Sequence, residues 1–263
     1  MKASSADLAG RAYWEETWQR RTTLGSVNLK NYSQARFDAV FTRFLPPGNG
    51  RALLEAGCAQ SSWLPYFRQR FGYEIVGLDY SETGCEAARR NLDRYGVEGI
   101  ILCRNFLDEH EDLRERFDVV FSYGVVEHFS QPEVVLERFR EFLKPGGLIV
   151  TIIPNVLGAM GWLQRTVNRP VYDVHVPMDL EELGRGHRAA GFEPIWASYV
   201  GSLGTEVVNY PSDAGWGVRA VRKLLKWTSK AGWMVFRATG WHPESEFLSP
   251  YVFFIGRNGG APA

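Results

Sequence analysis

The residues best suited to chemistry lie in the turn after the first predicted strand, Glu55-Ala56-Gly57-Cys58-Ala59-Gln60-Ser61. Its one glycine and its small or slim side chains let the backbone approach a ligand closely. Asp79 ends the next predicted strand, 24 residues after Glu55. A carboxylate at that point can accept two hydrogen bonds from a ribose diol. The turn and the acid together predict a site for a ribose-containing ligand.

These residues need a sheet to position them, and the pattern from residue 51 onward predicts one. Short apolar strands alternate with helices, which is typical of a doubly wound α/β sheet with helices on both faces. In such a sheet, ligands bind beyond the carboxyl ends of the strands, where Glu55 and Asp79 both fall. The predicted strands are 51–56, 73–80, 99–104, 117–123, 148–154, 193–200 and 249–257, and the predicted helices are 61–71, 81–96, 131–144, 155–169 and 179–192.

The remaining segments suggest three further parts of the chain. Residues 1–50 are predicted to form an N-terminal helical cap that ends at the boundary signal "PPGNG". Residues 51–257 form the main domain, with an irregular insert at about 200–248 between its last two strands. Residues 258–263 are expected to be a disordered tail.

A set of motifs resembles the class I S-adenosylmethionine-dependent methyltransferases over roughly residues 51–195. They are "LLEAGCAQS", "VGLDYSETGCEAARR", "RNFLD", "FDVVFSYGVVEHF", "REFLKPGGLIVTIIPN" and "HVPMDLEELGRGHRAAGF". Each motif alone is a weak signal, whereas their conjunction is specific. The resemblance implies a seven-stranded Rossmann-like sheet with an antiparallel last strand. It also implies S-adenosyl-L-methionine as methyl donor and S-adenosyl-L-homocysteine as product.

The resemblance also implies a role for particular positions. Glu55 would hold a water or amine near the methionine part, and Asp79 would bind the ribose hydroxyls. Asn105 would lie near the adenine amino group. The full set of implied cofactor contacts is Glu55, Gly57, Cys58, Ala59, Asp79, Tyr80, Asn105, Phe106, Ser122 and Tyr123.

The chain departs from the usual pattern of that family at three of its positions. Ala59 and Ser61 stand where glycine is usual, and Asn105 stands where aspartate is common. An amide oxygen still accepts from an adenine amino group, although less strongly than a carboxylate does. We therefore expect a functional cofactor site, with a degenerate scaffold as the alternative.

Methyl transfer from a sulfonium requires little covalent chemistry from the protein, because the leaving group is neutral. Alignment and exclusion of water do most of the work, and a base is needed only if the acceptor must lose a proton. The candidate bases are His128, His175, Tyr172 and Asp173, with the two histidines preferred. Each histidine has a structural alternative, which is to order the turn at Glu127 or to anchor its own loop. In some related quinone methyltransferases a Glu-His pair helps bind a metal. This chain lacks the additional acids around that pair, so no metal is predicted.

Three aromatic residues of the N-terminal cap, Tyr13, Trp14 and Trp18, share one face of a predicted helix. One interpretation is a lid over the methionine end of the cofactor, so Tyr13 and Trp14 count among the candidate cofactor contacts. The other is the buried side of a capping helix.

Bulk composition narrows the class of protein. The net charge is zero, with 30 basic and 30 acidic residues, which argues against a general nucleic-acid binder. The three cysteines, Cys58, Cys85 and Cys103, fit buried thiols in a reducing compartment. No signal-peptide pattern and no long apolar run is present. The sequence predicts a cytoplasmic protein.

His110 and His187 stand beside charged residues and are expected at the surface.

The insert contains an unusual run of basic residues. Between Asp213 and Glu244 there are six bases and no acid. Val218, Val221, Leu224 and Leu225 are expected on one helical face there, with the bases mainly opposite. This helix could pack on its own domain with its basic face in solvent, or make a peripheral membrane contact through 216–237. Alternatively, the insert could roof the pocket together with 158–173, or form a homodimer contact.

These observations lead to one main hypothesis and two alternatives. The main hypothesis is a methyltransferase that acts on O, N or S of a small, apolar or aromatic acceptor. The aromatic insert would suit such an acceptor as part of the pocket, because ligand pockets are mostly apolar. The alternatives are an RNA or protein methyltransferase and a non-catalytic binding protein of the same fold. The segment "SYGVVEHF" lacks the Asn/Asp-Pro-Pro-aromatic motif of many RNA and protein-amide N-methyltransferases.

Overall fold

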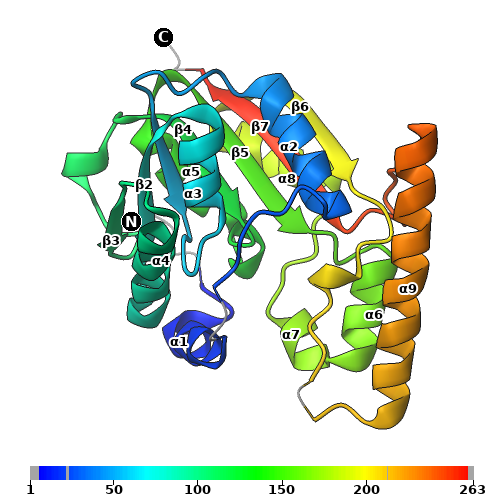
Figure 1. Ribbon diagram of the computed structural model, residues 1–263. Coiled ribbons are helices and arrows are strands. Elements are labelled where there is room, and N and C mark those ends of the chain that lie inside the picture. Colours follow the sequence, from blue (N-terminus) through cyan, green and yellow to red (C-terminus); the bar gives the residue numbers. More distant parts are fainter. Residues whose placement is uncertain (1–5, 22–23, 212, 260–263) are drawn as a thin grey trace.

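The computed structural model describes residues 6–21, 24–211 and 213–259, so residues 260–263 of the expected tail lie outside the described part. Seven strands form one sheet in the order β3-β2-β1-β4-β5-β7-β6 (Figure 1). Strands β1 to β5 pair in parallel, and β7 runs antiparallel to both β5 and β6. This confirms the predicted α/β fold with its antiparallel last strand. The strands are β1 Ala52–Ala56, β2 Glu74–Asp79, β3 Ile100–Cys103, β4 Phe117–Tyr123, β5 Leu143–Pro154, β6 Phe192–Val200 and β7 Tyr251–Asn258.

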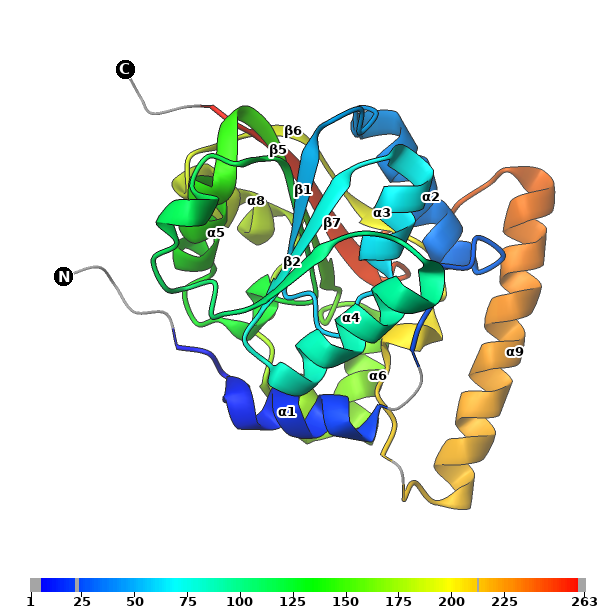
Figure 2. The same cartoon turned by 60° about the vertical axis from the view of Figure 1, so that its left-hand side comes forward.

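Helices cover both faces of this sheet (Figure 2). Successive strand residues point to opposite faces, so Leu53 joins the core under α2 and α3 while Leu54 joins the core under α5 and α8. The α-helices are α1 Gly10–Arg20, α2 Tyr32–Phe44, α3 Trp63–Phe71, α4 Glu82–Tyr95, α5 Pro132–Phe142, α6 Ala159–Val167, α7 Arg169–Asp173, α8 Leu180–Ala189 and α9 Trp216–Thr239. Three short 3₁₀ helices, η1 Glu111–Leu113, η2 Val126–His128 and η3 Thr205–Val207, complete the described elements.

Three local predictions were wrong. Strand β5 begins at Leu143, so "PGG" lies inside the strand, where the pairing of β4 with β5 shifts register between Phe117 and Val119. The helix expected at 155–169 is shorter, α6, and a second helix, α7, begins at Arg169, because Pro170 is tolerated only in the first turn of a helix. His187 is fully buried, because it lies one helical turn after buried Leu183 on the inner face of α8.

Helices α1 and α9 both lie outside the sheet layers and attach differently. Helix α1 lies against α4 (Figure 2), where the Glu15 carboxylate accepts from the backbone N–H groups of Glu82 and Thr83 at 2.7 and 3.2 Å. Helix α9 stands at the edge of the molecule beside α6 (Figure 1). No helix among the described residues has the length and apolar character needed to cross a bilayer.

Candidate functional site

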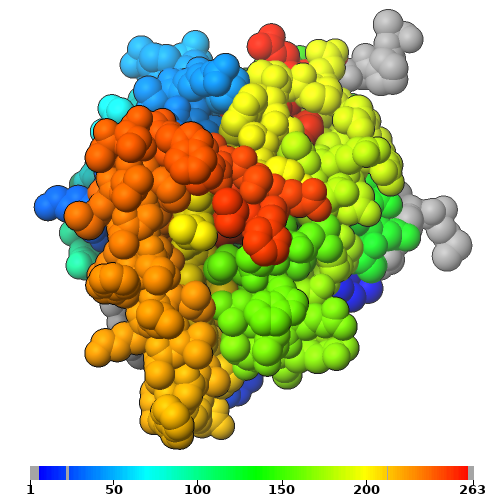
Figure 3. Space-filling model, turned by 90° about the vertical axis from the view of Figure 1, so that its right-hand side faces the viewer, coloured from blue at the N-terminus to red at the C-terminus, as the bar shows by residue number. Residues whose placement is uncertain are grey.

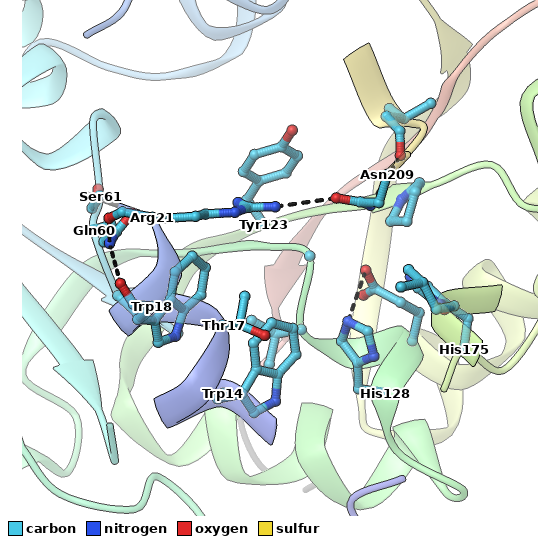
Figure 4. Close-up of a pocket in the computed structure, with 18 of the residues that line it drawn as sticks. Trp14, Thr17, Trp18, Arg21, Gln60, Ser61, Tyr123, His128, His175 and Asn209 are labelled. Atoms are coloured by element: carbon cyan, nitrogen blue, oxygen red, sulfur yellow. Dashed lines mark hydrogen bonds and ion pairs between the residues drawn. The ribbon is translucent and has the colours of Figure 1, made fainter. Parts of the chain in front are cut away.

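A cavity of about 670 Å³ opens beyond the carboxyl ends of β1, β2 and β4 (Figure 4). Proteins with a doubly wound sheet bind their ligands at this edge of the sheet. Eleven of the fourteen residues predicted from the sequence line it: Tyr13, Trp14, Glu55, Gly57, Ala59, Asp79, Tyr80, Phe106, Tyr123, His128 and His175.

The turn after β1 is intact despite its missing glycines. Gly57 has φ +80°, and a Cβ there would lie 2.3 Å from a Val125 methyl carbon, so glycine is required. The Ser61 hydroxyl donates to Glu55 and accepts the backbone N–H groups of Trp63 and Leu64 at 3.0 and 3.1 Å. Ser61 therefore caps the start of α3 and holds Glu55 in the cavity wall. Burial raises the pKa of Glu55 to about 8.

Ala59 is also accommodated by its surroundings. Its methyl group packs against Gly84 at the start of α4, where a Cβ would lie 2.4 Å away. Its backbone N–H donates to Asp79 at 3.1 Å. Because Gly84 has no side chain, the methyl group of Ala59 fits between the turn and α4.

Asp79 connects this turn to the next helix. Its two carboxylate oxygens accept from the backbone N–H groups of Ala59 and, at 2.8 Å, Ser81. Burial raises the pKa of Asp79 to about 6, an effect that these hydrogen bonds oppose. At neutral pH the carboxyl is therefore ionised, and each oxygen keeps a lone pair for a ligand hydroxyl.

Helix α1 closes one side of the cavity. Trp14 and Trp18 stack with their ring centroids 5.6 Å apart and both line the cavity (Figure 4). Gln60 donates its side-chain amide to the carbonyls of Trp18 and Arg21. The turn after β1 and the N-terminal segment are thus joined directly. Tyr13 and Trp14 both line the cavity, so this side of α1 faces the cavity as well as the rest of the domain.

Two histidines form the far wall. The Nδ1 of His128 lies 2.8 Å from the carbonyl oxygen of Val174, and the Nδ1 of His175 lies 2.7 Å from that of Val171. A carbonyl can only accept, so each Nδ1 carries the proton and each Nε2 keeps its lone pair. Burial lowers both pKa values, that of His128 to about 4, so both rings are neutral. The ring centroids are 4.5 Å apart.

Glu127 completes a cluster with these rings. Its two carboxyl oxygens have no hydrogen-bond partner among the described residues, and burial raises its pKa to about 8. One oxygen lies 3.9 Å from Nε2 of His128, so a protonated acid faces a neutral base rather than forming an ion pair at neutral pH. Ligand atoms of Glu127, His128 and His175 lie within 4.8 Å of one another, close enough to hold a metal ion. The absence of a metal stays a prediction, which elemental analysis of the purified protein would check.

Several candidates lie away from the cavity wall. Cys58 is fully buried beside Gly77, the Ser122 hydroxyl is buried without a partner in the described chain, and Asn105 uses its side-chain oxygen to accept from the backbone N–H of Leu107. The cavity geometry does not support side-chain contacts for these three, and their roles stay predictions. Tyr172 and Asp173 do not line the cavity either.

The roof of the cavity comes from parts of the two segments expected there, 158–173 and the start of the insert at about 200–248. Helix α6 and η3 meet there, with the Gln164 side-chain oxygen accepting from the backbone N–H of Asn209 at 2.6 Å. The insert contributes Glu206, Val207 and Asn209 to the lining, whereas its basic helix α9 contributes no lining residue. Lining residues that sequence reasoning missed include Gln60, Ser61, Asn155, Met160, Gln164, Glu206, Asn209 and Tyr251.

Known proteins resemble this chain in sequence and in fold. A family model described as "Methyltransferase domain" matches residues 54–151. The chain is 33% identical over 180 residues to a ubiquinone biosynthesis O-methyltransferase of Cereibacter sphaeroides, covering 63% of this chain and 70% of that protein. It is 30% identical over 190 residues to the protein of the same name from Rhodopseudomonas palustris, covering 65% and 73%.

Solved structures share the fold at lower identity. Phosphoethanolamine N-methyltransferase 2 of Haemonchus contortus, solved with S-adenosylmethionine, has a TM-score of 0.61 at 17% identity, covering 96% of this chain and 59% of that one. Geranyl diphosphate C-methyltransferase of Streptomyces coelicolor has a TM-score of 0.59 at 15% identity, covering 85% and 77%. The cavity fits the cofactor of such proteins, because Glu55, Gly57 and Asp79 line it together and Asp79 presents an ionised carboxylate. The chain therefore belongs to the class I S-adenosylmethionine-dependent methyltransferases.

Proposed function

We propose that the protein methylates a hydroxyl oxygen of a small, apolar, aromatic acceptor. When bound, S-adenosylmethionine supplies an electrophilic methyl group. The observation that carries the choice of oxygen is the neutral His128 at the cavity wall, whose Nε2 lone pair is free to take a proton. A phenol has a pKa near 10 and must lose its proton during transfer, so it needs such a group. The names of the two bacterial relatives support the same chemistry.

The cavity wall suits an aromatic acceptor. Trp14, Tyr123, Tyr251, Met160 and Val207 all line it. Aromatic and apolar walls bind a ring by burial of its surface, and a few polar groups orient it. The acceptor is therefore expected between α1 and the roof, with its hydroxyl toward His128.

His128 and Glu127 share the proton chemistry in this proposal. A neutral imidazole with a pKa of about 4 is a weak base on its own. When Glu127 loses its proton, near pH 8, a carboxylate faces Nε2 of His128 and stabilises the imidazolium that forms. His128 thus takes the proton, and Glu127 determines how readily it does so.

A matched panel of acceptors tests the proposal. Simple phenols and catechols, with anilines and thiophenols of the same size, are incubated with the protein and S-adenosylmethionine, and methylated products are identified by mass spectrometry. We expect methylation of the phenols, at least about tenfold faster than of the matched amines. Transfer to nitrogen or sulfur alone would contradict the proposal. Binding of S-adenosylhomocysteine without any turnover would favour a non-catalytic protein instead.

A further inference from the structure

Helix α9 has two apolar faces, and only one of them packs against the protein. On the inner face, Ser229 and Phe236 are buried, and the Trp233 indole N–H donates to the carbonyl of Ser202 at 2.8 Å. Trp233 also stacks on Tyr32 with ring centroids 5.8 Å apart. These contacts fix the helix to the domain and therefore fix which side of it faces outward.

The outward side carries large apolar side chains. Trp216, Trp227 and Met234 are 81%, 69% and 72% exposed. They recur after eleven and seven residues, roughly three and two turns, so they form one stripe along the helix. Leu224 and Val235 are exposed beside this stripe. Of the four apolar residues expected on one face, Val218 and Leu225 are partly buried, whereas Val221 and Leu224 are exposed.

Basic side chains run along one edge of this apolar stripe. With 3.6 residues per turn, they lie between the packed face and the exposed apolar stripe. No acidic residue lies on α9, and no ion pair joins its bases to an acid in the described part of the chain. The bases of this edge are Arg219, Lys223, Lys226, Lys230 and Arg237.

We propose that the outer face of α9 docks onto an anionic phospholipid bilayer. Exposed tryptophans with an adjoining row of lysines and arginines suit the boundary between acyl chains and anionic headgroups. The charge is what selects this partner over a second copy of the chain. An antiparallel two-fold contact through the same face would bring one basic row against another, and a parallel one would leave both rows without acids from α9, whereas an anionic surface complements them.

The same side of the molecule includes the roof of the cavity. Helices α9 and α6 lie side by side there, with the segment before β7 next to them (Figures 1 and 3). That neighbourhood also exposes Trp162, Trp241 and Phe247. The other side of α6 lines the cavity through Met160, Gly161 and Gln164. Docking would place the roof at the bilayer surface, where an apolar acceptor dissolves; this consequence alone rests on the proposed function.

Vesicle sedimentation of the full-length protein tests the docking. Sucrose-loaded vesicles of phosphatidylcholine alone, or with a quarter of phosphatidylglycerol, are mixed with the protein at low salt and pelleted. We expect binding to the anionic vesicles, little binding to phosphatidylcholine, and release as salt rises, because salt screens charges at a surface. Protein that stays in the supernatant with anionic vesicles at low salt would overturn the proposal.

Matched variants locate the docking surface. Lys226→Glu with Lys230→Glu should weaken vesicle binding at least about 25-fold. Arg90→Glu with Arg185→Glu changes net charge equally, on α4 and α8, and should have a far smaller effect. Trp227→Ser should weaken binding on the order of tenfold. Ile100→Ser, at an exposed apolar residue of β3, should not.

Two readouts separate this proposal from others. All variants should bind S-adenosylhomocysteine as wild type does, because α9 does not line the cavity. Light scattering without lipid reports self-association. If Trp227→Ser dissolves a dimer and leaves vesicle binding unchanged, the face is a contact between copies and the membrane proposal is wrong. If cofactor binding is normal and phenols are not methylated, the proposed function fails while the docking result still stands on its own.

Discussion

Replacing His128 with alanine is expected to lower kcat for a phenol acceptor by about 10²- to 10⁴-fold. The reason is that the proton of the hydroxyl then has no acceptor at the cavity wall. The His128 ring is hydrogen-bonded to Val174, whereas Asp79 is hydrogen-bonded to Ala59 and Ser81 in the turn after β1 and at the start of α4, so affinity for S-adenosylhomocysteine should change little. The measurement is steady-state kinetics with a calorimetric titration on the same preparation.

The pH profile separates proton transfer from a structural role of His128. In wild type, kcat should rise as pH increases through about 8, because Glu127 loses its proton there and stabilises the imidazolium. Glu127→Gln keeps the shape of the side chain and should remove this rise. His128→Gln retains a donor for the Val174 carbonyl, so it is the matched structural control. Full activity in His128→Gln would show that the ring only orders the loop and would contradict the proton role.

Replacing Asp79 with alanine is expected to weaken S-adenosylhomocysteine binding at least about 100-fold. Two charge-assisted hydrogen bonds to the ribose hydroxyls are lost, each worth about 1.5–3 kcal/mol, and about 1.4 kcal/mol corresponds to tenfold in affinity. The backbone N–H groups of Ala59 and Ser81 also lose their acceptor, so the turn after β1 loosens. Isothermal titration calorimetry measures the affinity, and circular dichroism checks the fold.

Acid titration gives an independent test of Asp79 in the unchanged protein. Burial raises its pKa to about 6, so the carboxylate is present above that pH and is neutralised as pH falls through it. Affinity for S-adenosylhomocysteine should therefore fall below about pH 6 in wild type. Asp79→Asn has no such proton to gain, so its weaker affinity should be flat across the same range. An unchanged affinity in Asp79→Ala would exclude this carboxylate from the cofactor site.

The cofactor-site residues that the sequence predicted correctly as lining the cavity share one feature, their position at the end of a predicted strand. Glu55, Gly57 and Asp79 each follow a strand, and parallel strands bring their carboxyl ends to one edge, so alternation alone places them together. Ala59 and Ser61 stand where the family usually has glycine, so the sequence alone left the cofactor site in question. The structure shows that Gly84 leaves room for the Ala59 methyl group and that Ser61 caps α3, contacts that sequence patterns do not reveal.

The parts that sequence missed depend on contacts between distant segments. Gln164 and Asn209 meet in the roof although 45 residues separate them. His187 stands between charged neighbours and is buried nonetheless, because its ring stacks on Phe254 of β7 with centroids 3.8 Å apart. The basic pattern of α9 predicted an amphipathic helix, but which apolar face packs was decided by Tyr32 and Ser202.

The most direct test of the central claim is a crystal structure of the protein grown with S-adenosylhomocysteine. The claim is that one cavity binds the cofactor at Asp79 and places the acceptor hydroxyl at His128. We predict that the ribose hydroxyls donate to Asp79 and that the sulfur faces the space between Trp14, His128 and His175. A cofactor whose sulfur points away from His128, or a cavity end at His128 closed off from the sulfur, would contradict the account.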